Sequence, residues 1–387
     1  MKLYNRVTHN YDEFYVKEIA GIYVCGITPY DSAHLGHIFT FMTYDLIQRR
    51  LEDDGIEVRL VRNITDVDEP IFKRAAELNI DYRKLARQET DDFQDVMRRL
   101  NFRPAFAEPK ASEYIDQMAD AIKDLLDKGA AYRLGHDIYF DVKSDPSYGS
   151  FSSFPPKLLP RFLKLRGGDP DRDGKRNPLD FLLWRGISDK EDKAAWDSIV
   201  GRGRPGWHIE CTVMSAETLG IPLLLHGGGS DLIFPHHESE IAQARALYEE
   251  SSFSEHWLHV APLSYLGEKM SKSLGNLVFA KDLLKAHKPS AIRLALMHYH
   301  YREGGEWQPE LLDEAADLLD RLSSCFGRVS QDQASALLDS LRNAIDNDLD
   351  THSIYHILQD FCDRPVGDGK AESETLNRIT DLLGIKF

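Results

Sequence analysis

Cysteine and long apolar runs are both scarce in this chain of 387 residues. The four cysteines (Cys25, Cys211, Cys325 and Cys362) lie far apart, which excludes the dense disulfide framework of small secreted domains. No apolar run approaches the roughly 18 residues that a membrane helix needs. The residues after Met1 form no apolar signal core. We therefore expect a cytoplasmic protein with no membrane partner.

Basic residues are few toward the end of the chain. The whole sequence holds 47 basic and 63 acidic residues, a net charge of −16. Residues 303–387 alone hold 18 acidic and 7 basic residues, a net charge of −11. Phosphate contacts require clustered lysine and arginine, so this charge pattern argues against nucleic-acid binding by the segment.

The remaining composition is that of a globular protein. Apolar residues make up 42 % and charged residues 28 % of the chain, which excludes general disorder. At about 150 residues per domain, the length suits two or three domains. Residues 21–25 and 58–61 read as buried strands, and residues 35–51 between them have helical spacing. A strand, a helix and a second strand in this order predict a Rossmann-type parallel α/β sheet.

The pattern further along the chain divides it into four parts. We expect the first half of the catalytic sheet in residues 1–95 and an insertion in residues 96–178. The second half of the sheet should follow in residues 179–288, with the α/β pattern resuming at 179–184. From about residue 289 the chain reads as a bundle of helices only. Within the insertion, residues 144–178 read as a solvated loop with four basic side chains, namely Lys157, Arg161, Lys164 and Arg166.

A His-Leu-Gly-His motif at residues 34–37 stands between the first strand and the first helix. The start of a helix offers unpaired N–H groups and a positive dipole, both of which suit phosphate. His34 and His37 share one helix face, and Gly36 allows a flat ligand to approach the backbone. Taken alone, so short a match is more often a pair of capping or surface histidines.

A second motif, Lys-Met-Ser-Lys-Ser, occupies residues 269–273 and is followed by Leu-Gly-Asn. Its two lysines, Lys269 and Lys272, could neutralise the charge that grows on a pyrophosphate leaving group. The alternative is an ordinary solvated loop.

Candidate metal ligands gather in a third pattern. His236 and Glu240 are four residues apart and would share one face of a helix. Cys25 ends the first strand, and Cys211 follows a Trp-His-Ile-Glu segment. Two thiolates, an imidazole and a carboxylate suit Zn²⁺. His237 competes with His236 as the histidine ligand.

The two nucleotide motifs together resemble those of class I aminoacyl-tRNA synthetases. That resemblance implies activation of an amino acid with ATP, accompanied by Mg²⁺, to give an aminoacyl-adenylate and pyrophosphate. It assigns catalysis to His34, His37, Lys269 and Lys272. It assigns ATP binding to Thr28, Gly36, Ser271 and Ser273.

Cys25, residues 207–211 and residues 227–238 look like the cysteinyl-tRNA synthetase branch of that family. The resemblance implies one zinc ion held by Cys25, Cys211, His236 and Glu240, with the thiolate of substrate L-cysteine bound to it. It also places Asp231 on the substrate ammonium. The rest of the cysteine pocket would be formed by Gly26, Thr65 and Trp207.

Several segments resemble a paralogue of those synthetases, the cysteine:glucosaminyl-inositol ligases of mycothiol biosynthesis. Residues 25–31 read Cys-Gly-Ile-Thr-Pro-Tyr-Asp where the synthetases usually have Cys-Gly-Pro-Thr-Val-Tyr-Asp. Pro70 stands where they usually have lysine, and residues 166–172 and 300–303 are also ligase-like. Glu240 and the opening residues 3–5 are more typical of the synthetases.

The resemblance thus implies an ATP-dependent ligase, a monomer or homodimer, that joins cysteine to the amine of an amino sugar. Synthetases continue from the helical bundle into an anticodon-binding domain, which we do not expect here. Two alternatives remain open. One is a short cysteinyl-tRNA synthetase, and the other is a non-catalytic paralogue that senses cysteine or nucleotide.

Overall fold

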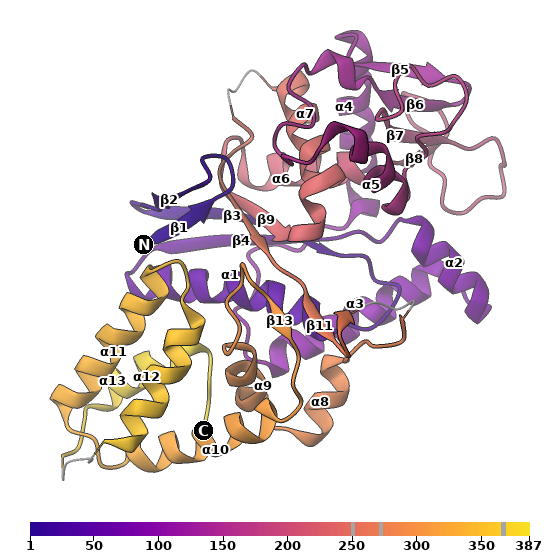
Figure 1. Cartoon of the computed structure of the whole chain (residues 1–387). Coiled ribbons are helices and arrows are strands. Elements are labelled where there is room, and N and C mark those ends of the chain that lie inside the picture. The colour runs from indigo at the N-terminus through magenta and orange to yellow at the C-terminus, as the bar shows by residue number, and fades with distance from the viewer. Residues whose placement is uncertain (249–251, 271–273, 365–368) are drawn as a thin grey trace.

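The computed structural model describes residues 1–248, 252–270, 274–364 and 369–387. Its centre is a sheet of four parallel strands in the order β10, β9, β3, β4 (Figure 1). The Rossmann-type α/β fold predicted from the sequence is confirmed. The strands are β3 (Ile19–Ile27), β4 (Glu57–Ile64), β9 (Leu223–Gly229) and β10 (Ser254–Val260).

Both faces of this sheet are buried, and β3 shows why the strand reads as one apolar run. Ile22 and Val24 point into the core shared with the C-terminal helices. Tyr23 and Cys25 point into the core on the opposite face. Successive side chains of a strand alternate between faces, so a strand covered on both sides needs apolar residues at every position.

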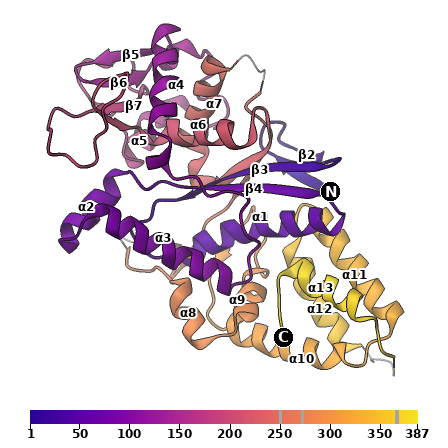
Figure 2. The same ribbon diagram turned by 180° about the vertical axis from the view of Figure 1, so that it is seen from behind.

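Helices cover the two faces in separate groups (Figures 1 and 2). Helix α1 (Leu35–Asp53) lies on one face, between the sheet and the C-terminal helices, while α4 (Ile115–Asp127), α6 (Trp207–Leu219) and α7 (Glu238–Leu247) lie on the other. Helices α2 (Glu69–Leu78) and α3 (Tyr82–Arg99) follow β4 and pack against each other. A hairpin of β1 (Lys2–Asn5) and β2 (Asn10–Glu13) opens the chain.

A second, antiparallel sheet forms the insertion, with the order β5, β6, β7, β8. The expectation that the catalytic sheet resumes at residues 179–184 is wrong, because this segment becomes β7 and pairs with β6 and β8. A short apolar run shows that a strand is buried but not which sheet it joins. The insertion comprises β5 (Ala131–Leu134), β6 (Asp137–Phe140), α5 (Leu159–Leu165), β7 (Phe181–Gly186) and β8 (Gly203–Pro205).

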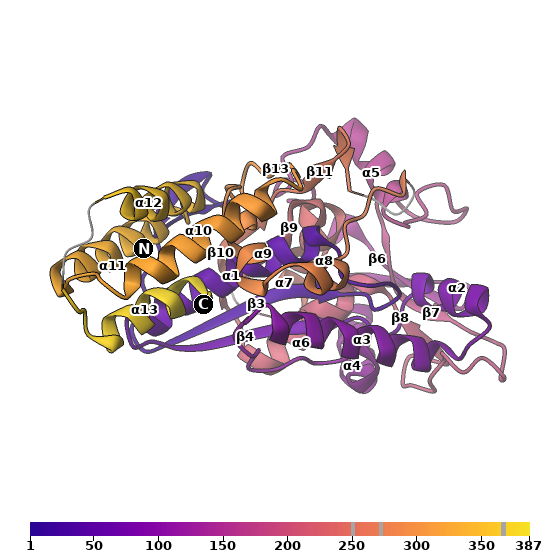
Figure 3. The same ribbon diagram turned by 90° about the horizontal axis from the view of Figure 1, so that it is seen from below.

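The last part of the chain is mostly helical, and Figure 3 shows α10–α13 gathered at one end of the molecule. The expectation of helices only needs one correction, because β13 (Gly305–Glu306) pairs in parallel with β11 (Leu263–Tyr265). The third strand of this small sheet is β12 (Glu268–Lys269). The helices are α8 (Ala280–Ala286), α9 (Pro289–Leu296), α10 (Leu311–Phe326), α11 (Gln331–Asp346), α12 (Thr351–Asp363) and α13 (Ser373–Leu383). Among the helices that the structure describes, none is long and apolar enough to span a membrane.

Candidate active site

A cavity of about 440 Å³ opens at the carboxyl ends of the parallel strands, where ligands bind in open α/β sheets. Most of the residues singled out in the sequence meet there. The cavity is lined by Cys25, Gly26, Thr28, His34, Gly36, His37, Trp207, Asp231 and Lys269. Ser271, Lys272 and Ser273 lie outside the described residues. Thr65 is buried next to Asn63, whose Nδ2 donates to the Thr65 hydroxyl at 3.1 Å, instead of facing the cavity.

The two histidines of the first motif stack at the start of α1, with ring centroids 3.8 Å apart. The N–H of Gly36 donates to His34 Nδ1 at 3.1 Å, so His34 caps the helix and carries its proton on Nε2. Burial lowers the pKa of His34 to about 3 and that of His37 to about 4. Both imidazoles are therefore neutral at physiological pH and can offer phosphate an N–H donor rather than a full charge.

Asp231 sits between two cations from different parts of the chain. Its carboxylate accepts a hydrogen bond from Arg166 Nη1 at 3.0 Å and lies 3.5 Å from Lys269 Nζ. Burial opposes ionisation, but Lys269 and Arg166 lower the pKa of Asp231 below its usual value. The expectation that Arg166 belongs to a solvated loop is wrong, because the insertion carries it to the cavity wall. A run of basic residues gives no sign of which side chain turns inward.

The predicted metal ligands converge beneath the cavity. Cys25 Sγ lies 3.7 Å from Cys211 Sγ and 3.7 Å from Glu240 Oε1, and His236 Nε2 lies 2.9 Å from the same carboxylate oxygen. The ligand atoms of these four buried side chains all fall within 4.8 Å of one another. Two thiols, one imidazole and one carboxylate in so small a space fit a four-coordinate Zn²⁺ site.

A second set of donors shares two members of this cluster. Cys25, His226, His237 and Glu240 also bring their ligand atoms within 4.8 Å of one another. His226 Nε2 lies 2.6 Å from Glu240 Oε2, and His237 Nδ1 lies 2.7 Å from His259 Nε2. The geometry thus leaves His236 and His237 both close to the thiols. His226 and His259 were missed in the sequence, because strand residues carry no motif spacing relative to α7.

The two thiols of the cluster differ in pKa. Burial raises the pKa of Cys25 above its ordinary value. Burial acts in the same direction on Cys211, but its hydrogen bond with Cys25 and the charge of His236 lower the Cys211 pKa to about 6. A thiol that ionises readily is suited to metal ligation, which requires the thiolate.

Gly26 joins the cluster to the cavity, and its lack of a side chain is required by the packing. Its N–H donates to Asn63 Oδ1 at 2.8 Å, and a Cβ atom here would lie 1.7 Å from the backbone oxygen of Asn63. We expect Gly26→Ala to cost at least about 1–3 kcal/mol of stability, as overpacking does, because β3 and β4 must separate. Urea unfolding measures this cost. Gly21→Ala is the matched control on the same strand, since its Cβ would meet only the Leu219 side chain at 3.7 Å.

Comparison with known proteins places this site in a family. The family model described as the class I (C) tRNA synthetase catalytic domain matches residues 13–317. A relative from Thermobispora bispora is 40 % identical over 100 % of this chain and 95 % of its own length. One from Corynebacterium jeikeium is 42 % identical over 95 % of this chain and 91 % of its own. Both are named L-cysteine:1D-myo-inositol 2-amino-2-deoxy-α-D-glucopyranoside ligases, the second as ligase 2. The chain belongs to this ligase family.

Solved structures agree with the fold of the ligase family. A Mycobacterium tuberculosis methionyl-tRNA synthetase with methionyl-adenylate has a TM-score of 0.61 at 17 % identity, covering 95 % of this chain and 88 % of its own. A leucyl-tRNA synthetase from Agrobacterium radiobacter has a TM-score of 0.67 at 11 % identity, covering 94 % and 82 %. The protein is therefore a cysteine ligase, an enzyme that forms a carbon–nitrogen bond with ATP, built on the class I synthetase fold.

Proposed function

We propose that this ligase activates L-cysteine with ATP and transfers the cysteinyl group to the amine of 1D-myo-inositol 2-amino-2-deoxy-α-D-glucopyranoside. The observation that carries the proposal is the two-thiol cluster of Cys25 and Cys211, which lies beneath a cavity whose rim holds His34, His37 and Lys269. Zn²⁺ bound by the cluster would take the substrate thiolate as an additional, fifth ligand and so distinguish cysteine from serine.

In the activation step, the carboxylate of cysteine attacks the α-phosphate of ATP and releases pyrophosphate. The neutral imidazoles of His34 and His37 offer N–H donors at the helix start, where the dipole also favours phosphate. Lys269, which lines the same cavity, supplies a positive charge, and we assign the same role to Lys272. These groups stabilise the charge that develops on the phosphate oxygens.

In the transfer step, the amine of the amino sugar attacks the carbonyl carbon of cysteinyl-adenylate. The C–N bond of an amide forms, the bond between the carbonyl carbon and the AMP phosphate oxygen breaks, and the proton lost by the amine passes to solvent. We assign Asp231 to the ammonium of cysteine, which would take the position that Arg166 occupies in the structure. Arg166 is then free to donate to hydroxyl groups of the acceptor.

We expect Arg166→Ala to impair transfer more than activation. The KM for the amino sugar should rise by about 10-fold to 100-fold, the size of one lost hydrogen bond to a charged group. Cysteine-dependent ATP–pyrophosphate exchange should change by less than about threefold, because it precedes the acceptor. Lys164→Ala is the matched control, since Lys164 stands two residues before Arg166, in the last turn of α5, but is exposed and pairs with Asp171. Equal loss in both half-reactions would contradict this role.

The full proposal is tested with three incubations of the zinc-loaded enzyme. Cysteine, ATP and pyrophosphate should exchange label; the further addition of the amino sugar should give the amide, detected by its mass, and AMP. Replacement of the sugar by tRNA should leave the tRNA uncharged. Charged tRNA would support the short synthetase instead, and absence of exchange would support a sensing paralogue.

A further inference from the structure

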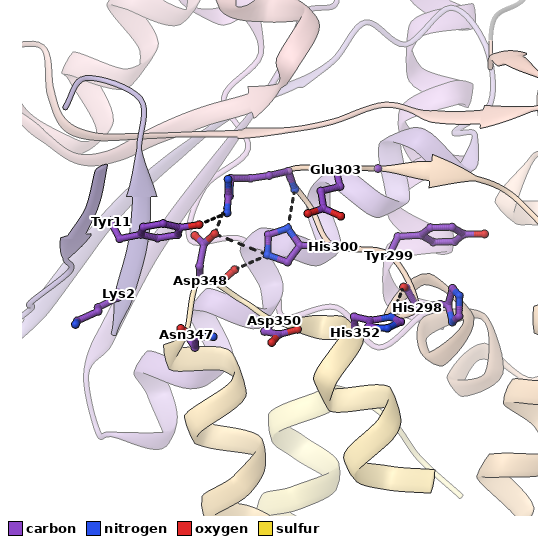
Figure 4. A pocket seen from close by; sticks show the side chains of 12 residues that line it. Lys2, Tyr11, His298, Tyr299, His300, Glu303, Asn347, Asp348, Asp350 and His352 are labelled. Carbon is purple, nitrogen blue, oxygen red and sulfur yellow. Dashed lines mark hydrogen bonds and ion pairs between the residues drawn. The ribbon is translucent and has the colours of Figure 1, made fainter. Parts of the chain in front are cut away.

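A cavity of about 690 Å³ lies away from the active site, between the opening hairpin, the loop after α9 and the start of α12 (Figure 4). The polar side chains of one wall already bond to one another. Asp348 accepts hydrogen bonds from the Tyr301 hydroxyl at 2.6 Å and from Arg302 Nε at 2.7 Å. Arg302 in turn donates to the Tyr11 hydroxyl at 2.6 Å. This wall holds the hairpin to the helical part of the chain and leaves little binding capacity.

The opposite wall carries histidines. His298 and His352 line the cavity, and His356 follows His352 by four residues on α12. Residues at this spacing share one helix face, as in helical His-x-x-x-His metal sites. Both His352 and His356 are exposed, and their Nε2 atoms lie 3.1 Å apart.

The hydrogen bonds of these two rings show which nitrogens are available. His352 Nδ1 lies 3.3 Å from the carbonyl oxygen of His298, so it carries a proton and donates. His356 Nδ1 lies 3.1 Å from Gln359 Oε1 and donates in the same way. In two neutral rings of this tautomer, the bare lone pairs of the Nε2 atoms face each other. That contact is repulsive unless a cation lies between them.

The spacing fits a metal ion. A metal–nitrogen distance of about 2.0–2.1 Å separates two ligand nitrogens by about 2.9 Å at a right angle and about 3.3 Å at a tetrahedral angle. The observed 3.1 Å falls between these values. Oxygen acceptors on both Nδ1 atoms are also the usual outer contacts of metal-binding histidines.

The ring of His298 lies beside the pair, but among the described residues its nitrogens do not come within 4.8 Å of both Nε2 atoms. Its ring centroid lies 5.5 Å from that of His352. Its buried Nδ1 atom has no hydrogen-bond partner among the residues that the structure describes. We propose that His352 and His356 form a second transition-metal site that is independent of the buried thiol cluster. Its ligand is a divalent cation that prefers imidazole, such as Zn²⁺, Ni²⁺ or Cu²⁺.

The test titrates the zinc-loaded full chain with Ni²⁺ in an isothermal calorimeter. We expect one equivalent of Ni²⁺ to bind, and His352→Ala and His356→Ala each to weaken its binding by at least about tenfold. His136→Ala, which removes an exposed histidine of the insertion, is the matched control and should bind as the wild type does. Unchanged zinc content in all variants shows that the thiol cluster is intact.

Two results would overturn the proposal. The first is the absence of Ni²⁺ binding to the wild type. It would mean that a proton lies between the two Nε2 atoms, either because one ring is protonated or because the Gln359 amide donates to His356 Nδ1 and leaves the proton of that ring on Nε2. The second is binding that survives the double replacement of His352 and His356. Both variants change exposed side chains, and circular dichroism checks that they fold. The outcome is separable from the proposed ligase activity, because Ni²⁺ binding is read without substrates.

Discussion

Replacing Cys211 by alanine should remove the bound metal and abolish cysteine-dependent ATP–pyrophosphate exchange. Cys211 supplies one of two thiols in the cluster and lies 3.7 Å from the other, on Cys25. Loss of a group that only orients a ligand weakens metal binding by about 10-fold to 100-fold, so loss of a ligand itself should exceed that range. We expect less than one tenth of the wild-type zinc content by elemental analysis after dialysis.

The control for this prediction is Cys325→Ala. Cys325 is also buried, but it lies in α10, in the helical part of the chain. Its replacement should leave zinc content and exchange unchanged apart from a modest loss of stability. Full zinc content in Cys211→Ala would show that the ion is held by the other donor set, Cys25, His226, His237 and Glu240.

The second large effect concerns stability. Asp45→Asn should lower the free energy of unfolding by about 3–5 kcal/mol, because it leaves the buried Arg293 without a carboxylate partner and Arg49 with Asp381 alone. Asp45 Oδ2 lies 2.8 Å from Arg49 Nε and 2.6 Å from Arg293 Nη2, and all three side chains are buried. Arg293 belongs to α9, so this carboxylate joins α1 of the catalytic sheet to the helical part of the chain.

The effect should depend on pH in a defined direction. Burial opposes ionisation of Asp45, but Arg293 and Arg49 lower its pKa in the folded state below the usual value. A depressed folded pKa contributes stability above the unfolded pKa of about 3.9, and that contribution is lost as the pH falls through the folded pKa. The difference between wild type and Asp45→Asn should therefore be full at pH 7 and shrink below about pH 4.

Asp54→Asn is the control for this pair of measurements. Asp54 also pairs with an arginine of α1, Arg50, at 2.5 Å, but its side chain is 54 % exposed. Because the Asp54 carboxylate is exposed and Arg50 keeps Asp346 as a second partner, the loss should be only about 0–1 kcal/mol. Urea unfolding of both variants should separate them clearly. Equal losses would mean that the buried network does not depend on the Asp45 charge.

The fold could be predicted from the sequence where the hydrophobic spacing of each segment agrees with the rules for connecting strands and helices. Residues 21–61 show a strand, a helix and a strand with short links, and such a unit has one common solution, a parallel pair. The insertion was harder. The strand Phe181–Gly186 opens with an apolar run, as β3 does, yet its partner is β6 of an antiparallel sheet. The residue types of a strand show that it is buried. The strand with which it pairs depends on contacts between segments that are dozens of residues apart.

The candidate site shows the same division. His34 and His37 are three residues apart, at the N-cap and in the first turn of α1, so the local helix start brings their rings together, with centroids 3.8 Å apart. Arg166 and Asp231 are 65 residues apart, and no local rule links them. Their pairing depends on how the insertion packs over the sheet. The same is true of Asn63, which receives the Gly26 N–H from the neighbouring strand.

The sequence by itself determined the chemistry of this protein: which donors could hold a metal, which groups could meet phosphate, and that the central strands are buried on both faces. These properties follow from residue type and from spacings of a few residues. The tertiary structure alone decided that Arg166 enters the cavity, that His226 and His259 lie at the thiol cluster, and that His298 meets α12. Such contacts join segments far apart in the chain, and their geometry arises only when the sheets and helices pack together.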